Sequence, residues 1–342
     1  MSQLLHPINM VDTSYFPASQ IFWDRLVQLG SMQLVLPAIY GALNRKKLVD
    51  HAPKDLVSYL QGITDLNQKR NNDILKQIDF LSKFFNTHQI DHVFLKGAAM
   101  LITKPYDTLS ERMVGDIDIL VSEIELLRAQ QLLLDEGFKE VSNEFNFTKG
   151  VFSDNYGKHL KRIAHPNYIA AIELHRQLLD DNNDLIRNKD ILKNKEQTHE
   201  GYHIPSKQYL WQHAILNWQY NDMGMARNAL NFRAVVDVLY LESKDVMVKL
   251  KTAPNAIKHF YSLLSLYYGK YKTYYIQKKL VYKWKLKSRV FDKLYSFFRN
   301  LSGLVSFGFS RIFLFSSSKI YRKRVLNNRK LLGQRILNYW NR

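Results

Sequence analysis

Two aspartates separated by one residue carry the clearest chemical signal in this chain. Residues 115–121 read GDIDILV, so Asp116 and Asp118 alternate with Ile117 and Ile119. Successive side chains of a strand point to opposite faces, and the two carboxylates therefore share one face. Like charges this close repel each other, and a divalent cation between them removes the repulsion. Oxygen ligands with no Cys or His nearby suit Mg²⁺ or Mn²⁺, so the pattern predicts a metal site for phosphoryl chemistry.

A lysine and a glycine turn the chain shortly before the aspartates. Residues 92–95 predict a strand, and residues 98–103 predict a short helix that starts at Lys96-Gly97. Backbone amides at a helix N-terminus bind phosphate, and glycine lets the phosphate approach the backbone closely. Lys96 would add a positive charge. A lone Lys-Gly also fits an ordinary turn, and the Asp pair that follows favours the phosphate-binding interpretation.

The order of these motifs resembles that of a known family. The run LKG at residues 95–97, then Arg112, then GDID at residues 115–118 resembles the uncharacterised nucleotidyltransferase family of the DNA-polymerase-beta-like superfamily, over about residues 23–241. Asp-x-Asp alone is weakly specific, whereas all these pieces in this order are much more specific. The resemblance implies an α+β fold: a small mixed β-sheet nucleotidyltransferase core with N-terminal and C-terminal helical regions. The superfamily usually has Gly-Ser at the turn. Gly97-Ala98 stands there in this chain, so amides, Lys96 or another group must replace the hydroxyl.

The resemblance also implies a third carboxylate on a later strand. Residues 168–175 alternate in a way that predicts a strand with Glu173 and His175 on one face. We expect this strand to lie antiparallel to the strand of the aspartates, so that Glu173 reaches the same cations. His175 would orient Glu173, contact a phosphate or move a proton, and a purely structural role is an equal alternative. His159 is expected to be structural.

The chemistry implied by the resemblance is metal-dependent transfer of NMP. An acceptor hydroxyl would attack the α-phosphorus of an NTP, ATP included, and pyrophosphate would leave. The implied metal ligands, for Mg²⁺ or Mn²⁺, and catalytic residues are Asp116, Asp118 and Glu173. The implied nucleotide-binding residues are Lys96, Gly97, His175 and Arg112, the last neutralising charge on the leaving side. The acceptor is open, and a link to cell-surface polysaccharide synthesis is an association of such families. A catalytically silent nucleotide-binding or scaffold protein, and an antitoxin-like or nucleic-acid-modifying enzyme, are the alternatives.

Helices are predicted on both sides of this core. Upstream, apolar residues at helical spacing predict two helices over residues 16–48, a short one from Pro53 to residue 60, and one over residues 64–86. Downstream, helices over residues 206–219 and 226–241 carry His213, Arg233 and Asp237, which resemble positions of the family. Arg233 and Asp237 are four residues apart, which predicts an ion pair on one helix, with a nucleotide-facing Arg233 as the alternative.

The charge of the chain is unevenly distributed. The 342 residues carry a net charge of +18, but residues 249–342 hold 22 Lys and Arg against one acid, Asp292, so the rest is slightly acidic. The composition therefore predicts four regions: helical residues 1–90, the core over 91–200, a helical lobe over 201–253 and a basic, aromatic-rich helical tail over 254–342. The absence of Cys excludes disulfides and thiolate sites and fits a reducing cytoplasm. No signal peptide and no spanning helix are predicted.

The tail mixes cations with aromatic and aliphatic side chains. Such a mixture fits an anionic membrane surface, where aromatic residues anchor and Lys or Arg meet headgroups. It also fits nucleic acid, through phosphate neutralisation and base stacking. The apolar content of residues 294–315 exceeds what phosphate binding needs, so the membrane surface is favoured over nucleic acid. A solvated helical face packed on the core is the third alternative.

Overall fold

The chain forms two compact units. The computed structural model describes residues 1–7, 20–141, 158–179, 183–243, 250–269, 271, 276–317 and 319–327. Unit 1 contains residues 1–141 and 158–276, and the described part of unit 2 begins at residue 277.

A mixed five-stranded sheet is the centre of unit 1. Its strands lie in the order β1-β2-β5-β4-β3, and a two-stranded sheet pairs β6 with β7. The strands are β1 (His92–Phe94), β2 (Asp116–Val121), β3 (Lys139–Glu140), β4 (Ile163–Ala164), β5 (Ala171–His175), β6 (Glu196–Gln197) and β7 (His203–Ile204). With helices on either side along the chain, this is the expected α+β fold.

The direction of β5 corrects one expectation. β5 pairs parallel to β2, not antiparallel, with Asp118 opposite Glu173. β1 pairs antiparallel to β2, and β4 pairs antiparallel to β5. A parallel neighbour needs a crossover connection, and the chain between β2 and β5 supplies one through a helix and two more strands. The alternation of apolar and polar residues predicts which face of a sheet a side chain lies on, but it does not predict whether two strands pair parallel or antiparallel.

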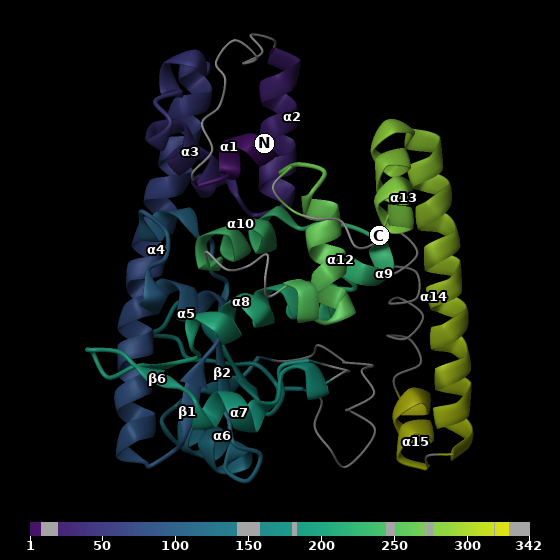
Figure 1. Ribbon diagram of the computed structural model, residues 1–342. Coiled ribbons are helices and arrows are strands. Elements are labelled where there is room, and N and C mark those ends of the chain that lie inside the picture. The colour runs from purple at the N-terminus through teal and green to yellow at the C-terminus, as the bar shows by residue number, and fades with distance from the viewer. Residues whose placement is uncertain are drawn as a thin grey trace. The chain divides into compact units, whose positions relative to one another are not determined.

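In Figure 1 the sheet lies in the lower half of unit 1, with helices beside it and other helices of this unit above it. Those before it are α1 (Ser2–Leu5), α2 (Gln20–Met32), α3 (Leu36–Arg45) and α4 (Lys54–Thr87), with a 3₁₀ turn η2 (Val49–His51). Those within and after it are α5 (Lys96–Thr103), η3 (Leu109–Glu111), α6 (Leu126–Asp135), η5 (Asn183–Leu185), α7 (Asn188–Lys193), α8 (Lys207–Leu216), the π-helical η6 (Asn217–Asn221), α9 (Gly224–Arg227), α10 (Phe232–Leu241) and α12 (Asn255–Leu264).

Two helix predictions need correction. The segments predicted from Pro53 and over residues 64–86 form one 34-residue helix, α4, because the buried stripe continues through polar residues such as Asn67 and Asn71. The helix predicted over residues 226–241 is interrupted. Asn228 ends α9 in the left-handed conformation, and the Asn231 side chain then caps α10 by accepting from the Ala234 amide. The sequence also predicts a strand over residues 143–148, which lie outside the described residues.

The described part of unit 2 is helical. It contains α13 (Ile276–Lys287), α14 (Arg289–Ser317) and α15 (Lys319–Asn327). Among the helices that the structure describes, none combines the length and the apolar character needed to cross a bilayer.

Candidate active site

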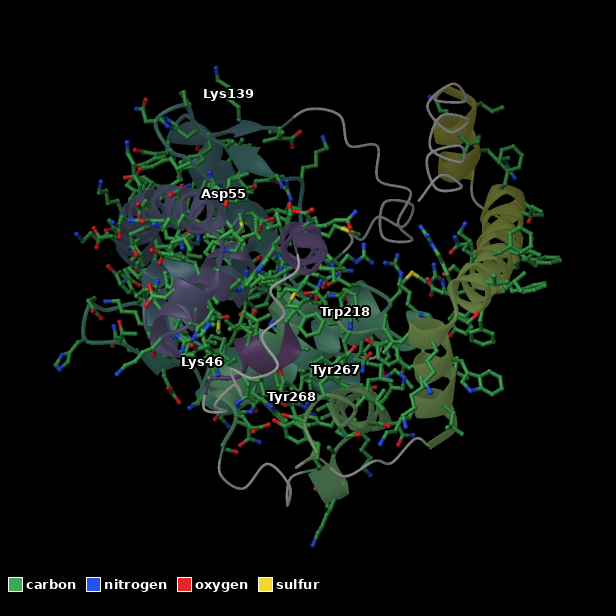
Figure 2. All side chains as sticks on the ribbon, turned by 90° about the horizontal axis from the view of Figure 1, so that it is seen from above. Lys46, Asp55, Lys139, Trp218, Tyr267 and Tyr268 are labelled. Atoms are coloured by element: carbon green, nitrogen blue, oxygen red, sulfur yellow. The ribbon has the colours of Figure 1, made fainter. Side chains whose placement is uncertain are left out.

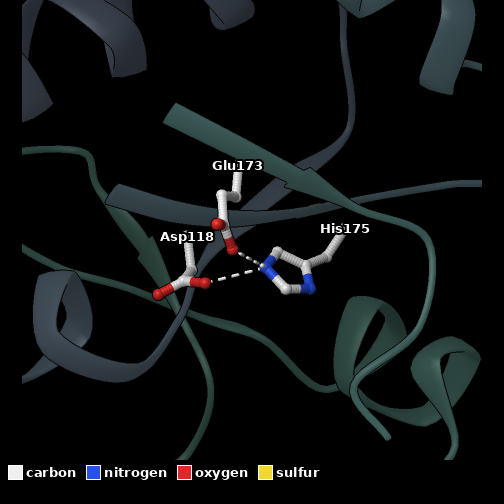
Figure 3. A group of neighbouring side chains, drawn as sticks. All are labelled: Asp118, Glu173 and His175. Atoms are coloured by element: carbon white, nitrogen blue, oxygen red, sulfur yellow. Dashed lines mark hydrogen bonds and ion pairs between the residues drawn. The ribbon is translucent and has the colours of Figure 1, made fainter. Parts of the chain in front are cut away.

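The acidic residues converge on one face of the sheet. The β2–β5 register places Asp118 directly opposite Glu173, and His175 follows two residues later on the same face of β5. The ligand atoms of Asp118, Glu173 and His175 lie within 4.8 Å of one another, and all three residues are buried (Figure 3). Local alternation, together with one long-range strand pair, thus builds a cluster that could hold a metal ion.

Asp118 is the centre of this cluster. Its Oδ1 accepts hydrogen bonds from Lys96 Nζ at 2.6 Å and from His175 Nε2 at 2.7 Å. Burial by itself would raise the pKa of the Asp118 carboxyl, but Lys96 and His175 outweigh it and hold this pKa well below its ordinary value. Asp118 is therefore ionised at neutral pH. Within the described part of the chain no residue bonds its Oδ2, which leaves that oxygen for a ligand.

Arg162 joins the other two carboxylates. Its Nη2 donates to Glu173 Oε1 at 2.8 Å and to Asp116 Oδ2 at 3.1 Å. Burial raises the pKa of Asp116, and the neighbouring Asp118 and Glu173 raise it further. For Glu173 burial acts in the same direction, but His175, His159 and Arg162 lower its pKa to about 2. A carboxylate with this pKa is a poor proton acceptor while these partners are in place.

Arg162 was not singled out by the sequence. The signal that could have found it is the β4–β5 register. Ile163 lies opposite Ile172, so the neighbouring Arg162 and Glu173 share the other face. This register cannot be predicted from the sequence unless it is already known that β4 pairs with β5.

The acids fit a divalent cation. Asp116, Asp118 and Glu173 gather on one sheet face, and two cationic side chains, Lys96 and Arg162, neutralise them. Clustered carboxylates need such counter-charge, and carboxylate oxygens are the ligands that Mg²⁺ and Mn²⁺ prefer. The ligand atoms that lie within 4.8 Å of one another belong to Asp118, Glu173 and His175, so the structure places His175, and not the predicted Asp116, in the closest cluster.

The Lys96-Gly97 turn lies against the site as predicted, between β1 and α5. Lys96 is the first residue of α5 and has φ +46°, a conformation that is uncommon for a residue with a side chain. A Cβ on Gly97 would lie 3.0 Å from Val114 Cγ1, so this position has little room for a side chain. Burial lowers the pKa of Lys96, but Asp118 outweighs it and raises this pKa. Lys96 is therefore charged at neutral pH.

Arg112 lies in a buried ion pair. Its Nε and Nη2 donate to the two carboxylate oxygens of Asp237 on α10, at 2.8 and 2.9 Å. Nη1 donates to the Met113 carbonyl, and the Tyr106 hydroxyl donates to Asp237 as well. The predicted ion pair between Arg233 and Asp237 is therefore wrong, because Asp237 is bound to Arg112. A direct contact of Arg112 with nucleotide stays a prediction.

Two further histidines that the sequence analysis named, His159 and His213, lie near the cluster. His159 forms a backbone bridge with His175, and its Nε2 lies 3.9 Å from Glu173 Oε2. His213 on α8 is buried, and burial together with Lys96 lowers its pKa to about 3. His213 is therefore neutral at physiological pH.

Comparison with known proteins agrees with this arrangement. No curated protein matches the chain. A family model described as "uncharacterised nucleotidyltransferase" matches residues 19–241, which include the sheet, the acidic cluster, α8 and α10. The chain belongs to this nucleotidyltransferase family.

Proposed function

We propose that this protein is an active, Mg²⁺-dependent nucleotidyltransferase that transfers NMP from an NTP, ATP included, to an acceptor hydroxyl. The observation that carries the proposal is the buried cluster of Asp118, Glu173 and His175 beside Lys96. Asp116 lies next to this cluster, where Arg162 joins it to Glu173. Membership of the family supports nucleotide transfer in general. When bound, Mg²⁺ or Mn²⁺ would neutralise phosphate charge and polarise the reacting phosphoryl group.

The side chains divide the remaining work. Asp116, Asp118 and Glu173 would hold the metal, and His175 would keep Asp118 in position through its 2.7 Å hydrogen bond. Lys96 would exchange its contact with Asp118 for a phosphate oxygen, next to the amides of the Gly97 turn. The acceptor oxygen forms a bond to the α-phosphorus, and the bond to the bridging oxygen of the leaving pyrophosphate breaks. The hydroxyl proton passes to Asp116, because burial and the neighbouring Asp118 and Glu173 raise the pKa of this carboxylate. Arg112 would act on the leaving side by fixing α10 through Asp237.

The acceptor is proposed only as a hydroxyl. A cell-surface glycan or its lipid-linked precursor is one acceptor of this class, and it agrees with the membrane-binding surface proposed below. A cytoplasmic location belongs to the same proposal, because the chain has no Cys.

The test follows label from nucleotide to acceptor. Each of the four α-labelled NTPs is incubated with Mg²⁺, the protein and fractions of a cell extract. We expect labelled NMP on one fraction together with released pyrophosphate, and a loss of at least about a hundredfold in Asp118→Asn. Asp73→Asn, which removes a carboxylate paired with Lys76 on the surface of α4, is the control and should be fully active. Nucleotide binding without transfer to any fraction would instead show the silent scaffold.

We also propose that unit 2 binds an anionic lipid surface. Along α14 the exposed apolar residues recur every three or four positions, which places them on one side of the helix: Val290, Leu294, Phe297, Phe298, Leu301, Val305, Phe309, Ile312 and Phe313. Phe309 and Phe313 are each 71% exposed. Helices α13, α14 and α15 carry five, four and four Lys or Arg residues against the single acid Asp292. An apolar stripe with flanking cations fits a bilayer with anionic headgroups.

Vesicle sedimentation tests this surface. The protein should bind vesicles containing phosphatidylglycerol more tightly than pure phosphatidylcholine vesicles, and Phe309→Glu should weaken binding by about tenfold or more. Ser296→Glu introduces the same charge on the opposite side of α14 and should have a much smaller effect. If both substitutions weaken binding equally, the added negative charge explains the effect and the apolar stripe does not contribute to vesicle binding. Binding of RNA but not vesicles, or a dimer that covers the stripe, would contradict the proposal.

A further inference from the structure

A small pocket opens beside the acidic cluster. Its volume is about 80 Å³, and Lys96 on α5 forms part of its wall. The rest of the wall comes mainly from α8, η6 and α10, and includes His213, Trp218 and Arg233. Because Lys96 also contacts Asp118, the pocket continues from the site of the proposed reaction.

Arg233 lines this pocket, and no residue that the structure describes pairs with its guanidinium. The carboxylate nearest to it in sequence on α10, Asp237, is bound by both edges of Arg112. Among the described residues, none forms a hydrogen bond or ion pair with the Arg233 guanidinium, although this side chain is half-buried. Guanidinium carries five N–H donors in a planar fork, and leaving them unsatisfied in a half-buried site is unfavourable. Burial and the nearby Arg112 lower the pKa of Arg233, and the more distant carboxylates of Asp237, Asp222 and Asp116 offset this only in part.

His213 is a second polar group without a partner in the same wall. It is only 2% exposed, and within the part of the chain that the structure describes its Nε2 has no hydrogen-bond partner. A neutral imidazole can donate one N–H, so His213 can contribute a hydrogen bond to a ligand in the pocket.

Charge favours an anionic ligand over an uncharged one. Arg112 neutralises Asp237, and Asp118 neutralises Lys96. Asp222 also lines the pocket, but it is exposed, accepts from Asn217, and forms no ion pair with Arg233 in the described structure. Among the described residues Arg233 is thus the cation of this wall that forms no direct ion pair, although Asp222 and Asp237 act on it through their charge. Planar bidentate donors match phosphate oxygens.

We propose that this pocket binds the terminal phosphates of the nucleotide, with Arg233 and His213 as donors and Lys96 between the pocket and the acids. The proposal rests on the proposed function for the identity of the ligand. The indole of Trp218, which is labelled in Figure 2, contributes an aromatic wall. Its Nε1 already donates to the Ala229 carbonyl. A nucleobase stacked on Trp218 is the competing occupant.

Calorimetry with inorganic tripolyphosphate and with the unphosphorylated nucleoside separates these occupants. We expect Arg233→Gln to weaken tripolyphosphate binding about tenfold or more, because it removes charge-assisted hydrogen bonds. Arg227→Gln removes the same charge from α9, where the exposed Arg227 does not line the pocket, and should change binding less than about twofold. His213→Leu should weaken binding by a smaller factor than Arg233→Gln. Thermal unfolding of each variant checks that it is folded.

The outcomes separate this inference from the proposed reaction. If tripolyphosphate binding depends on Arg233 but no acceptor receives NMP, the proposed phosphate pocket is supported and the proposed transfer reaction is contradicted. If NMP is transferred and Arg233→Gln leaves the KM for NTP unchanged, the proposed reaction is supported and the proposed phosphate pocket is overturned. An equal loss of nucleoside and tripolyphosphate binding, or no tripolyphosphate binding by the wild type, would also overturn it.

Discussion

Asp118 uses a single oxygen for both of its protein partners, Lys96 and His175. Lys96 supplies charge, and His175 supplies orientation through a buried hydrogen bond. Side chains that orient a metal ligand in this way commonly change metal affinity when they are removed. His175 is therefore a positioning residue for Asp118 even if its ring never touches the metal.

Replacing His175 tests this role at the level of metal binding. His175→Gln should weaken Mn²⁺ binding by about tenfold to a hundredfold, because Asp118 loses the group that fixes its orientation. The free Mn²⁺ signal in electron paramagnetic resonance measures the affinity without any turnover. His199→Gln, which changes an exposed histidine, is the control. Unchanged Mn²⁺ affinity in His175→Gln would remove both a ligand role and a positioning role.

His92 on β1 gives a prediction for stability against pH. Burial, only partly offset by the Ile90 carbonyl, lowers the pKa of His92 to about 4, below its unfolded value of about 6.5. The unfolded chain therefore takes up a proton first as pH falls. The contribution of His92 to the free energy of unfolding is complete above about pH 6.5 and declines by roughly 3 kcal/mol as pH falls to about 4. Urea unfolding should show a steeper pH dependence over this window in the wild type than in His92→Gln, whatever their stabilities at pH 7. Parallel curves would refute this.

The same residue scale shows what could be predicted from sequence. Strand alternation is local, so the common face of Asp116 and Asp118 and that of Glu173 and His175 could be predicted without a fold. Arg162 could not, because its contact with Glu173 depends on the pairing of β4 with β5. Arg112 was found by its place in the motif, but its partner Asp237 lies 125 residues away, and no spacing rule reaches that far.

At the scale of elements, α4 fixes the connector that leads to β2. Asn71 Nδ2 donates to the carbonyls of Leu109 and Arg112, and Asn67 Nδ2 donates to those of Ser110 and Arg112. Six residues further on, Gln77 exchanges two hydrogen bonds with the backbone of Ala170, just before β5. One polar stripe on a helix thus holds the starts of both strands that carry the acids. Hydropathy could not predict this, because the stripe is buried yet polar.

Removing Asn71 should therefore weaken both the fold and the site. Asn71→Ala removes two hydrogen bonds and leaves the Leu109 carbonyl without its donor, while the Arg112 carbonyl keeps Asn67. We expect a loss of about 2 kcal/mol or more in the free energy of unfolding. Denaturant unfolding measures it. Asn72→Ala on the exposed face of the same helix is the matched control and should stay within about 0.5 kcal/mol of the wild type. Equal losses in the two variants would mean that helix propensity, and not the connector, determines the effect.

At the scale of the whole molecule, the boundary between the two units lies further along the chain than the change in composition suggests. The basic texture begins near residue 254, but α12 is part of unit 1. Trp211 Nε1 on α8 donates to the Tyr261 hydroxyl at 2.9 Å, and Tyr261 and Tyr271 both donate to Glu242. The composition of a segment predicts its charge but not which domain it packs in. The aromatic residues of α12 pack in the core of unit 1.

Two shortened chains distinguish these boundaries. A chain ending at Ile276 keeps α12 and all acids of the site, so it should retain Mn²⁺ and tripolyphosphate binding and lose vesicle binding. A chain ending at residue 253 lacks α12 and leaves its partners on α8 exposed, including Trp211. Removing that much buried apolar surface costs more than a typical domain's net stability, so we expect this chain to be unfolded or aggregated. Circular dichroism and sedimentation report the fold, and calorimetry reports the site. If the chain ending at residue 253 stays folded and binds Mn²⁺, α12 is dispensable for the fold of unit 1. If the chain ending at Ile276 still binds vesicles, the lipid-binding surface does not lie on α13–α15.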